Sequence, residues 1–382
     1  MFTPLLPYAG SVTSVDLSRT VLRAVRRAVD DGELRVEPPE RVVVTTPGGG
    51  GWGDYATNVA LQLARPAGQP ALRVAEILRP RLIGLDGIDD VLVTGPGFLN
   101  IRLRDTVSVD LVHDILRRGT RYGFVDVPQG SQGFRSGPPA SPTPAPLPLH
   151  SPGDVRSLVV MDVVARLLRA QGVVVRTRCL DSSVAPSLAD QWGVRVDGYG
   201  AAGSDTPDLG ALPSPPCSLQ PRPCSGDPLF LGIDAGRWAL LHPAPHDAVR
   251  LTGDHLVQRE SNPLFRVRYA HARARAVLRN GSELGLAPRP GATGVADAAL
   301  LAVLADHPRV LRRAAETRAP DRLTRHLVAV ADAALPFLVT VLPRGDEKPS
   351  AAHRARLALA EAAGAVLAGG LSLLGIDAPD HL

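Results

Sequence analysis

One short segment of this sequence combines an aromatic ring, an amide and guanidinium groups on a single face. In a strand over residues 98–104, alternation places the aliphatic side chains toward the core and the opposite set outward, namely Phe98, Asn100, Arg102 and Arg104. A ring for stacking, an amide for a base edge and guanidinium groups for phosphates suit an unstacked RNA base. The alternative is an ordinary half-buried strand in which Phe98 covers a neighbouring helix, and the pattern alone favours that alternative.

A second segment, residues 262–279, predicts a helix with an arginine-rich surface. Ser261 is the expected N-cap, and Pro263 falls in the first turn, where proline is tolerated. Apolar residues at helical spacing form a buried stripe. Arginines occupy the remaining surface, with Arg268, Arg275 and Arg279 close together and Arg266 and Arg273 flanking them. Such a face can contact phosphates, although in most helices a basic face is simply solvated.

Composition limits the chemistry that the chain can perform. Lys348 is the only lysine, so every other basic residue is arginine, and no Walker A loop or Lys-Met-Ser-Lys-Ser type of loop is present to hold a triphosphate. The three cysteines, Cys179, Cys217 and Cys224, are too few and too irregular for a disulfide framework or a zinc site. We therefore expect neither a metal nor a cofactor. The net charge of +4 permits an RNA partner without requiring one.

The first part of the chain predicts a compact α+β domain over residues 14–126, because helical periodicity alternates with short strands. Asp16 is the expected cap of a first helix that ends at Gly32, and Asp54 is expected to begin a second helix. A third helix should follow Pro70. Two strands at 91–94 and 98–104 and a helix at 107–118 complete the predicted domain.

The rest of the chain divides by composition. Residues 127–152 are rich in Pro, Ser and Gly and predict a linker. Residues 153–229 hold one amphipathic helix, one apolar run and a second Pro-rich linker at 198–227, which predicts a truncated α/β unit, a Rossmann-like remnant. From 230 to 382 helical periodicity predicts an all-α bundle, whose last helix begins after Ser350 and ends at Gly375.

Two blocks near the front resemble the N-terminal tRNA-binding domain of arginyl-tRNA synthetases. They are Gly-Asp-Tyr-Ala-Thr-Asn at 53–58 and Gly-Phe-Leu-Asn at 97–100, and the likeness extends over about residues 17–122. In that family the aromatic and the amide of the second block meet a D-loop base at the tRNA elbow. The resemblance therefore implies this role for Phe98 and Asn100, with Arg102 on the same face.

The back of the chain resembles the same family's DALR-type anticodon-binding domain. The matching words are Asn-Pro-Leu-Phe at 262–265, Tyr-Ala-His-Ala-Arg at 269–273, Gly-Ile-Asp-Ala-Gly-Arg at 232–237 and the ending at 371–379. The resemblance implies that this helical domain binds RNA through Arg266, Arg268, Tyr269 and Arg273.

The middle departs from the family's catalytic core. Aligning Arg156, Ser157 and Asp162 with the family's helix places Ser-Pro-Gly-Asp at 151–154 on its His-x-Gly-His motif. The two histidines of that motif stabilise charge on the ATP α-phosphate. Only the glycine is kept, Asp154 would repel a phosphate, and His150 lies one position early. About eighty residues remain here, against the roughly two hundred or more that a nucleotide-binding core needs.

We therefore predict a non-catalytic arginyl-tRNA synthetase paralogue that binds tRNA, or a tRNA-like RNA, through its elbow and anticodon domains. No catalytic, cofactor-binding or metal-binding residue is expected. One alternative is a divergent but active arginyl-tRNA synthetase. Another is an interaction partner without an RNA ligand, for example one that docks on a true aminoacyl-tRNA synthetase. The sequence shows no apolar run of eighteen residues and no signal pattern, so we expect a cytoplasmic protein with no membrane segment.

Overall fold

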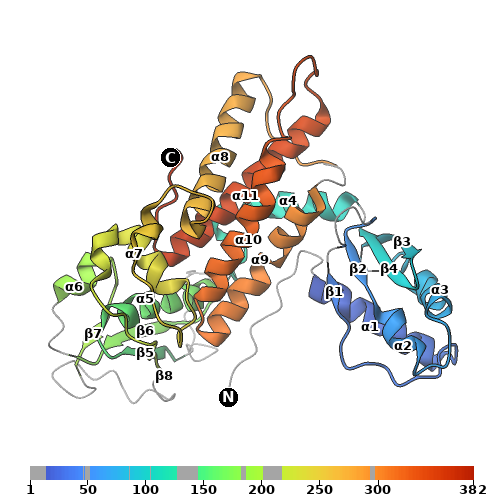
Figure 1. Ribbon diagram of the computed structural model, residues 1–382, viewed down its shortest axis with the longest axis horizontal. Helices are drawn as coiled ribbons and strands as arrows, with labels where there is room; N and C mark the ends of the chain where they lie inside the picture. The colour runs from blue at the N-terminus through green and yellow to red at the C-terminus, as the bar shows by residue number, and fades with distance from the viewer. Residues whose placement is uncertain are drawn as a thin grey trace, which may run out of the picture.

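The computed structural model describes residues 14–45, 47, 52–85, 87–103, 105–126, 145–181, 186–200, 217–292 and 297–382. A small α+β domain lies at one end of the molecule, and a helical bundle with a parallel sheet packed beside it forms the rest (Figure 1). Arg104 and the predicted linker residues 127–144 and 201–216 lie outside the described residues. The predicted order of α+β, truncated α/β and all-α parts is confirmed.

The N-terminal domain is an antiparallel sheet covered on one face by helices. Its strands are β1 (Val44–Thr45), β2 (Tyr55–Thr57), β3 (Ile88–Thr94) and β4 (Phe98–Leu103), in the order β1-β2-β4-β3. The covering helices are α1 (Ser14–Asp30), α2 (Val59–Ala64) and α3 (Ala71–Leu82). Leu99 and Ile101 are fully buried in the core with α1 and α3, so the predicted inward face of β4 is confirmed.

The prediction that Asp54 begins a helix is wrong. Asp54 is followed by strand β2, and α2 begins only at Val59. The backbone N–H of Asp54 donates to the Ile101 carbonyl at 2.9 Å, and its carboxylate accepts from the Leu103 N–H at 2.7 Å. These bonds align the chain with β4, and the β-favouring residues Tyr55 and Thr57 continue the pairing.

The middle of the chain forms a parallel sheet with strand order β7-β6-β5-β8. The strands are β5 (Leu147–Ser151), β6 (Val175–Cys179), β7 (Gly198–Tyr199) and β8 (Cys217–Ser218), with α5 (Val155–Ala170) and α6 (Pro186–Gln191) between them. In chain order this is 3-2-1-4, the first part of a doubly wound sheet. Both predicted linkers are therefore too long: 147–151 is a central strand, and 198–199 and 217–218 are strands at either edge.

The last third is helical, as predicted. Its helices are α7 (Gly232–Leu241), α8 (Pro263–Glu283), α9 (Ala298–Thr317), α10 (Asp321–Leu338) and α11 (Ala351–Leu374), with short 3-10 helices η2 (Pro228–Leu231) and η3 (Gly253–Leu256). The limits of α11 are confirmed: Ser350 and His353 form a capping box, and Gly375 ends the helix at φ 69°. The N-cap of α8 is Asn262 rather than Ser261, because the Asn262 side chain accepts from the N–H groups of Leu264 and Phe265.

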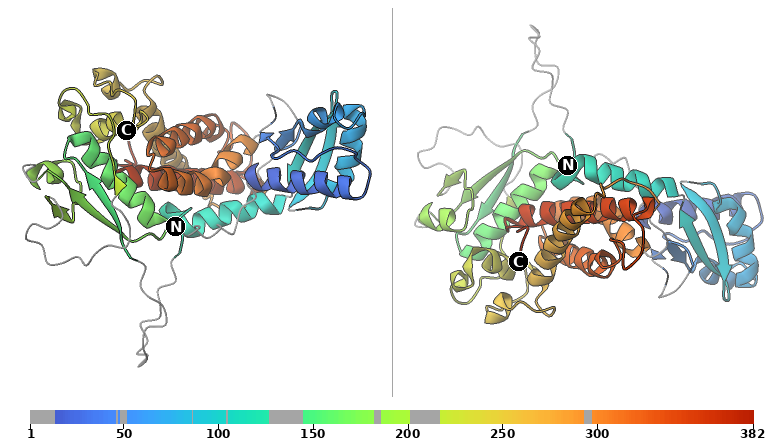
Figure 2. Two further views of the ribbon diagram at one scale, coloured as in Figure 1. Left: turned by 90° about the horizontal axis from the view of Figure 1, so that it is seen from below. Right: turned by 90° about the horizontal axis from the view of Figure 1, so that it is seen from above.

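Helix α4 (Asp105–Arg118) and the 3-10 helix η1 (Gly119–Arg121) belong to the helical body rather than to the N-terminal domain. Figure 2 shows α4 alongside α11 in both views. Ile115 and Tyr122 lie in the larger hydrophobic core, and a Cβ on Gly369 of α11 would come within 2.4 Å of the Thr120 carbonyl oxygen. The predicted boundary at 126 is thus too late, since the small core ends near residue 103.

Helix α11 resembles a membrane-spanning helix, although the sequence analysis expected no such segment. By length and composition it is apolar enough to cross a membrane, with a mean hydropathy of 1.8, yet 78% of that stretch is buried inside the protein. A helix that is apolar on all sides and surrounded by α8, α10 and α4 is the core of a bundle.

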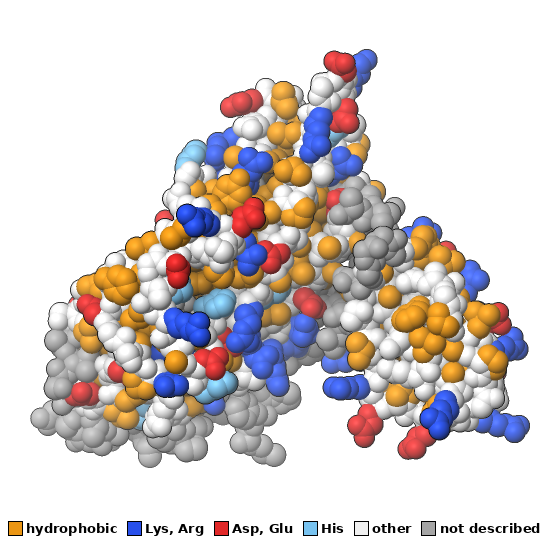
Figure 3. Space-filling model, in the orientation of Figure 1, with side chains coloured by type: hydrophobic (Ala, Val, Ile, Leu, Met, Phe, Trp, Pro, Cys, Tyr) orange, Lys and Arg blue, Asp and Glu red, His pale blue; other side chains and the backbone are white. Residues whose placement is uncertain are grey.

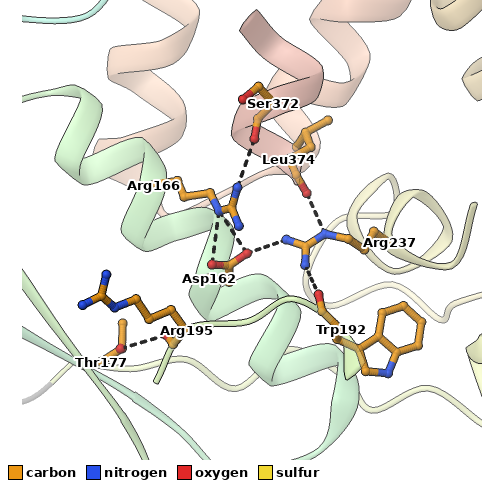
Figure 4. A network of polar contacts seen from close by, with 8 residues as sticks. All are labelled: Asp162, Arg166, Thr177, Trp192, Arg195, Arg237, Ser372 and Leu374. Atoms are coloured by element: carbon orange, nitrogen blue, oxygen red, sulfur yellow. Dashed lines mark hydrogen bonds and ion pairs between the residues drawn. The ribbon is translucent and has the colours of Figure 1, made fainter. Parts of the chain in front are cut away.

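A buried ion pair joins the parallel sheet unit to the bundle (Figure 4). Arg237 of α7 donates to the Asp162 carboxylate of α5, to the Trp192 carbonyl at 2.6 Å and to the Leu374 carbonyl at 2.8 Å. Burial lowers the pKa of Arg237 while Asp162 opposes that shift. The arginine is therefore enclosed, and each of its three guanidinium nitrogens donates to a different segment.

Replacing Arg237 by Met should destabilise the fold strongly, because Asp162 would keep its charge in a buried site with only the partly exposed Arg166 left to pair with it. We expect a loss of about 3–5 kcal/mol in unfolding free energy. The double variant Arg237→Met/Asp162→Leu should recover much of that loss, since it removes both charges together. Urea titrations of the parent and both variants measure these differences. A single variant that loses less than about 1 kcal/mol would show that the pair is not a structural requirement.

Two buried histidines should make stability depend on pH. His307 and His326 lie with ring centroids 5.2 Å apart, and His307 stacks on Tyr122 at 5.9 Å. Burial lowers the pKa of His326 to about 4 and that of His307 well below its ordinary value, while Asp306 opposes and Arg309 reinforces the shift at His326.

Because the folded pKa lies below the unfolded one, His326 should stabilise the fold above about pH 6.5 and lose that contribution as the pH falls toward 4. The loss should be on the order of 3 kcal/mol. Unfolding free energies measured across this range should fall less for His326→Phe, which keeps a ring but cannot be protonated. Equal pH dependence in the two proteins would contradict this assignment.

Candidate nucleic-acid interface

The outer face of the N-terminal sheet carries Phe98 and Asn100 side by side on β4. Phe98 is 40% exposed, whereas Asn100 is only 6% exposed and donates an amide hydrogen to Thr94 Oγ1 at 2.6 Å. That bond orients the amide and leaves its second N–H and its carbonyl oxygen for other partners. The predicted pairing of an exposed ring with a positioned amide is therefore present in the geometry.

The turn before Phe98 depends on two glycines. Gly95 has φ 53° and Gly97 has φ 134°, both in the region that side chains avoid. A Cβ on Gly97 would also come within 2.9 Å of the Ala71 backbone at the start of α3. The turn therefore packs tightly on α3, which fixes the position at which Phe98 leaves the sheet.

Arg102 is held by neighbours that the sequence analysis missed. Its guanidinium lies 4.9 Å from the centroid of the Trp52 ring and pairs with the carboxylates of Asp89 at 3.4 Å and Asp90 at 3.9 Å. The side chain remains 47% exposed. Arg102 therefore offers a stacking surface more than a free charge for a phosphate. The signal that could have revealed Trp52 is its place immediately before the Gly-Asp-Tyr block.

One face of α8 presents aromatic rings and an arginine. Phe265 and Tyr269 stack with centroids 5.4 Å apart and planes 15° apart, and Tyr269 is exposed. Arg273, one turn further, is half-buried and makes no ion pair within the described part of the chain. Arg266 instead pairs with Asp332 of α10 at 3.0 Å. Tyr269 and Arg273 are thus brought together, and Arg266 joins two helices.

The other edge of α8 is covered by the end of the chain. Arg268 pairs with Asp234 of α7 at 2.7 Å and donates to the Asp377 carbonyl. Asp380 accepts from Arg275 at 2.9 Å, and its backbone carbonyl accepts from Arg279. The predicted grouping of Arg268, Arg275 and Arg279 is real, but its charges are largely satisfied inside the protein. Arg268 is consequently the weakest of the predicted phosphate contacts.

The segment 151–154 in the middle unit is closed by its own hydrogen bonds. The Asp154 carboxylate caps α5 by accepting from the Ser157 N–H at 3.1 Å, and Ser151 Oγ lies 2.7 Å from Ser157 Oγ. Burial and the charge of Arg178 lower the pKa of His150. No group of three metal-ligating side chains occurs among the described residues, and the three cysteines are unbridged there.

Comparison with known proteins identifies the two outer domains. Residues 16–103 match the model of the arginyl tRNA synthetase N terminal domain, and residues 267–382 match the DALR anticodon binding domain. The chain therefore carries a match to a different domain model at each end. The two matched stretches contain the faces described above, on β4 and α8. The residues predicted to bind RNA all lie in these stretches, except Arg266, which lies one residue before the second.

Relatives along the whole chain are arginine–tRNA ligases. The protein from Frankia alni is 27% identical, with 97% of this chain and 100% of the relative aligned. A stretch of 167 residues is 40% identical to the protein from Renibacterium salmoninarum, covering 43% of this chain and 30% of that one. The alignment with the Frankia protein runs over 559 residues against the 382 of this chain, so many residues of the relative have no counterpart here.

Solved structures confirm the fold. Arginyl-tRNA synthetase from Plasmodium falciparum aligns over 98% of this chain and 100% of that one, with a TM-score of 0.65 and 8% identity. The Thermus thermophilus enzyme aligns over 96% of this chain and 100% of that one, with a TM-score of 0.59 and 15% identity. The synthetase-like arrangement of an N-terminal α+β domain, a parallel sheet and a helical region is therefore shared.

Proposed function

We propose that this protein is a non-catalytic paralogue of arginyl-tRNA synthetase that binds tRNA, or a tRNA-like RNA, through its two outer domains in the cytoplasm. The observation that carries the proposal is a contrast within one chain. Both tRNA-synthetase domains are complete enough to match their family models, while the middle unit is a four-stranded sheet with two strands of only two residues.

The residues at the start of α5, where ATP would be polarised, are unsuited to catalysis. In a doubly wound sheet, ligands bind beyond the carboxyl ends of the strands where the strand order reverses, which here is between β5 and β8. The helix that begins there is α5, and its first-turn amides would suit a phosphate. Asp154 occupies that end with its own carboxylate and takes the Ser157 N–H. A negative group at this place opposes a phosphate.

No lysine elsewhere in the chain can reach the middle unit to hold a triphosphate. Lys348 lies in the loop just before α11, whose opposite end reaches Arg237 and the α5 helix. A helix of 24 residues is about 36 Å long, so Lys348 is separated from the middle unit by the length of the bundle. The alternative of a divergent active synthetase would need another cation, which only arginine or protonated histidine could supply in this chain.

A role as an interaction partner without RNA remains the second alternative. The exposed rings of Phe98 and Tyr269 would serve a protein partner, such as a true aminoacyl-tRNA synthetase, as well as an RNA base. Positioning of the Asn100 amide by Thr94 favours RNA, because a fixed amide is suited to reading a base edge.

The purified protein should show no arginine-dependent exchange of pyrophosphate into ATP, because no side chain that the structure describes in the middle unit is placed to polarise the α-phosphate. The measurement is isotope exchange at high protein concentration, with an active synthetase as the positive control. Pyrophosphate exchange that requires arginine and disappears in the His150→Ala variant would contradict the non-catalytic proposal.

Phe98→Ala should weaken tRNA binding by about 1–3 kcal/mol, since a stacked base would lose its aromatic partner. This is roughly a five- to more than hundredfold loss in affinity. Ile83→Ala is a matched control, because Ile83 is similarly exposed in the same domain but lies at the end of α3. Affinities come from titrations with tRNA and with an unstructured RNA. Unchanged tRNA affinity in folded Phe98→Ala protein would show that the elbow assignment is wrong.

A further inference from the structure

The arginines of the helical body differ in how far the protein itself satisfies them. On α8, Arg266, Arg268 and Arg275 each pair with a carboxylate of another segment. Such arginines are tied into the fold, and their charge is already compensated. A surface that attracts the phosphates of an RNA should instead carry arginines that lack an internal carboxylate.

A second basic cluster surrounds the turn between α9 and α10. Within 306–325 six arginines accompany three acidic residues. Figure 3 shows Lys and Arg side chains gathered around the lower ends of these helices. Three arginines pair within their own helix: Arg309 with Asp306 at 2.6 Å, Arg313 with Glu316 at 3.5 Å and Arg325 with Asp321 at 2.9 Å. For Arg312, Arg318 and Arg322 the described residues provide no ion pair.

Helix electrostatics account for Arg318, which follows the last residue of α9, but not for Arg312 or Arg322. A cation near the C-terminal end of a helix is stabilising, but the effect is limited to the last turn, and Arg312 lies five residues before the end of α9. Arg322 is the second residue of α10, at the positive end of that helix, where a cation is disfavoured. Its exposed charge therefore costs α10 stability rather than adding to it.

The backbone conformation at the turn between α9 and α10 suggests that Arg318 has a role other than stabilising the fold. Arg318 has φ 53°, and it is the only residue other than glycine with a positive φ in the described part of the chain. Glycine or asparagine normally occupies this position after a helix, because other side chains are strained there. An arginine at this position therefore places a charge on the turn at a conformational cost.

We propose that Arg312, Arg318 and Arg322 form a contact for the ribose-phosphate backbone of RNA, separate from the aromatic faces on β4 and α8. The assignment rests on the proposed RNA-binding function and adds a sequence-independent electrostatic contact to it. Guanidinium groups without internal carboxylates can take phosphate oxygens directly, and each contact releases counterions from the RNA.

The test compares two variants that each remove three charges. The cluster variant is Arg312→Gln/Arg318→Asn/Arg322→Gln, in which Asn suits the left-handed turn. The control is Arg26→Gln/Arg27→Gln/Arg35→Gln, because these exposed arginines lie on and just after α1, on the helix-covered side of the N-terminal sheet. Dissociation constants for tRNA and for an unstructured RNA are measured across a salt series, and thermal melting checks the fold.

The cluster variant should weaken binding to both RNAs. Its slope of log affinity against log salt should flatten by about 0.7–0.9 for each arginine removed. The control should keep the parent's slope, and Phe98→Ala should lower tRNA affinity without changing that slope. The variant Arg312→Lys/Arg322→Lys should also keep the parent's slope, because lysine preserves both positive charges.

A folded cluster variant with the parent's slope would overturn the assignment. The assignment would also be overturned if the slope of the control variant flattened by the same amount. If the cluster variant does not fold, Arg322→Gln alone should still flatten the slope, and an unchanged slope would decide against the proposal. A parent protein that binds neither RNA would refute the proposed function together with this contact. A parent that binds tRNA with a slope unaffected by the cluster would refute only the contact.

Discussion

The buried Arg237 guanidinium is the constraint on which the arrangement of the larger body depends. A cation that is 1% exposed must find acceptors in the protein, because water cannot supply them. Its acceptors come from α5, from the residue after α6 and from the end of α11. Three segments that are distant in sequence are therefore required to meet at one point, and the end of α11 can take only one position relative to the parallel sheet.

A second buried arginine extends the same logic. Arg156, at the start of α5, is fully buried and donates to backbone carbonyls of the 240–247 segment, including Leu240 at 3.1 Å, Ala244 at 2.9 Å and Asp247 at 2.8 Å. These bonds satisfy an irregular stretch that would otherwise leave buried carbonyls without donors. The middle unit thus has a structural role in the bundle that is independent of any nucleotide.

Local signals in the sequence identified much of the fold. Ser350 and Gly375 bracket α11 correctly because capping depends on neighbouring residues. The inward face of β4 followed from simple alternation. The predictions were wrong where residues distant in sequence determine the local structure. Asp54 enters a strand because its hydrogen bonds reach Ile101 and Leu103, which no local pattern reveals.

The candidate site divides in the same way. An exposed Phe98 beside a polar Asn100 was predictable from period-two alternation, whereas the Thr94 bond that positions the amide requires the turn geometry. Trp52 was missed because its stacking with Arg102 depends on pairing between β2 and β4. Arg268 looked available on a helical wheel, yet it is taken by Asp234 and Asp377 from the far ends of the helical region.

The packing of α4 against α11 determines how the two outer domains are spaced. The N-terminal domain is joined to the bundle through α4, which shares the bundle's core, and not through the parallel sheet. The separation between the β4 face and the α8 face is therefore set by helices outside the middle unit. A change in the strands of that unit would leave α4 and α11 in contact, so it would leave the span between the two faces unchanged. A two-point attachment to a single ligand would depend on that span.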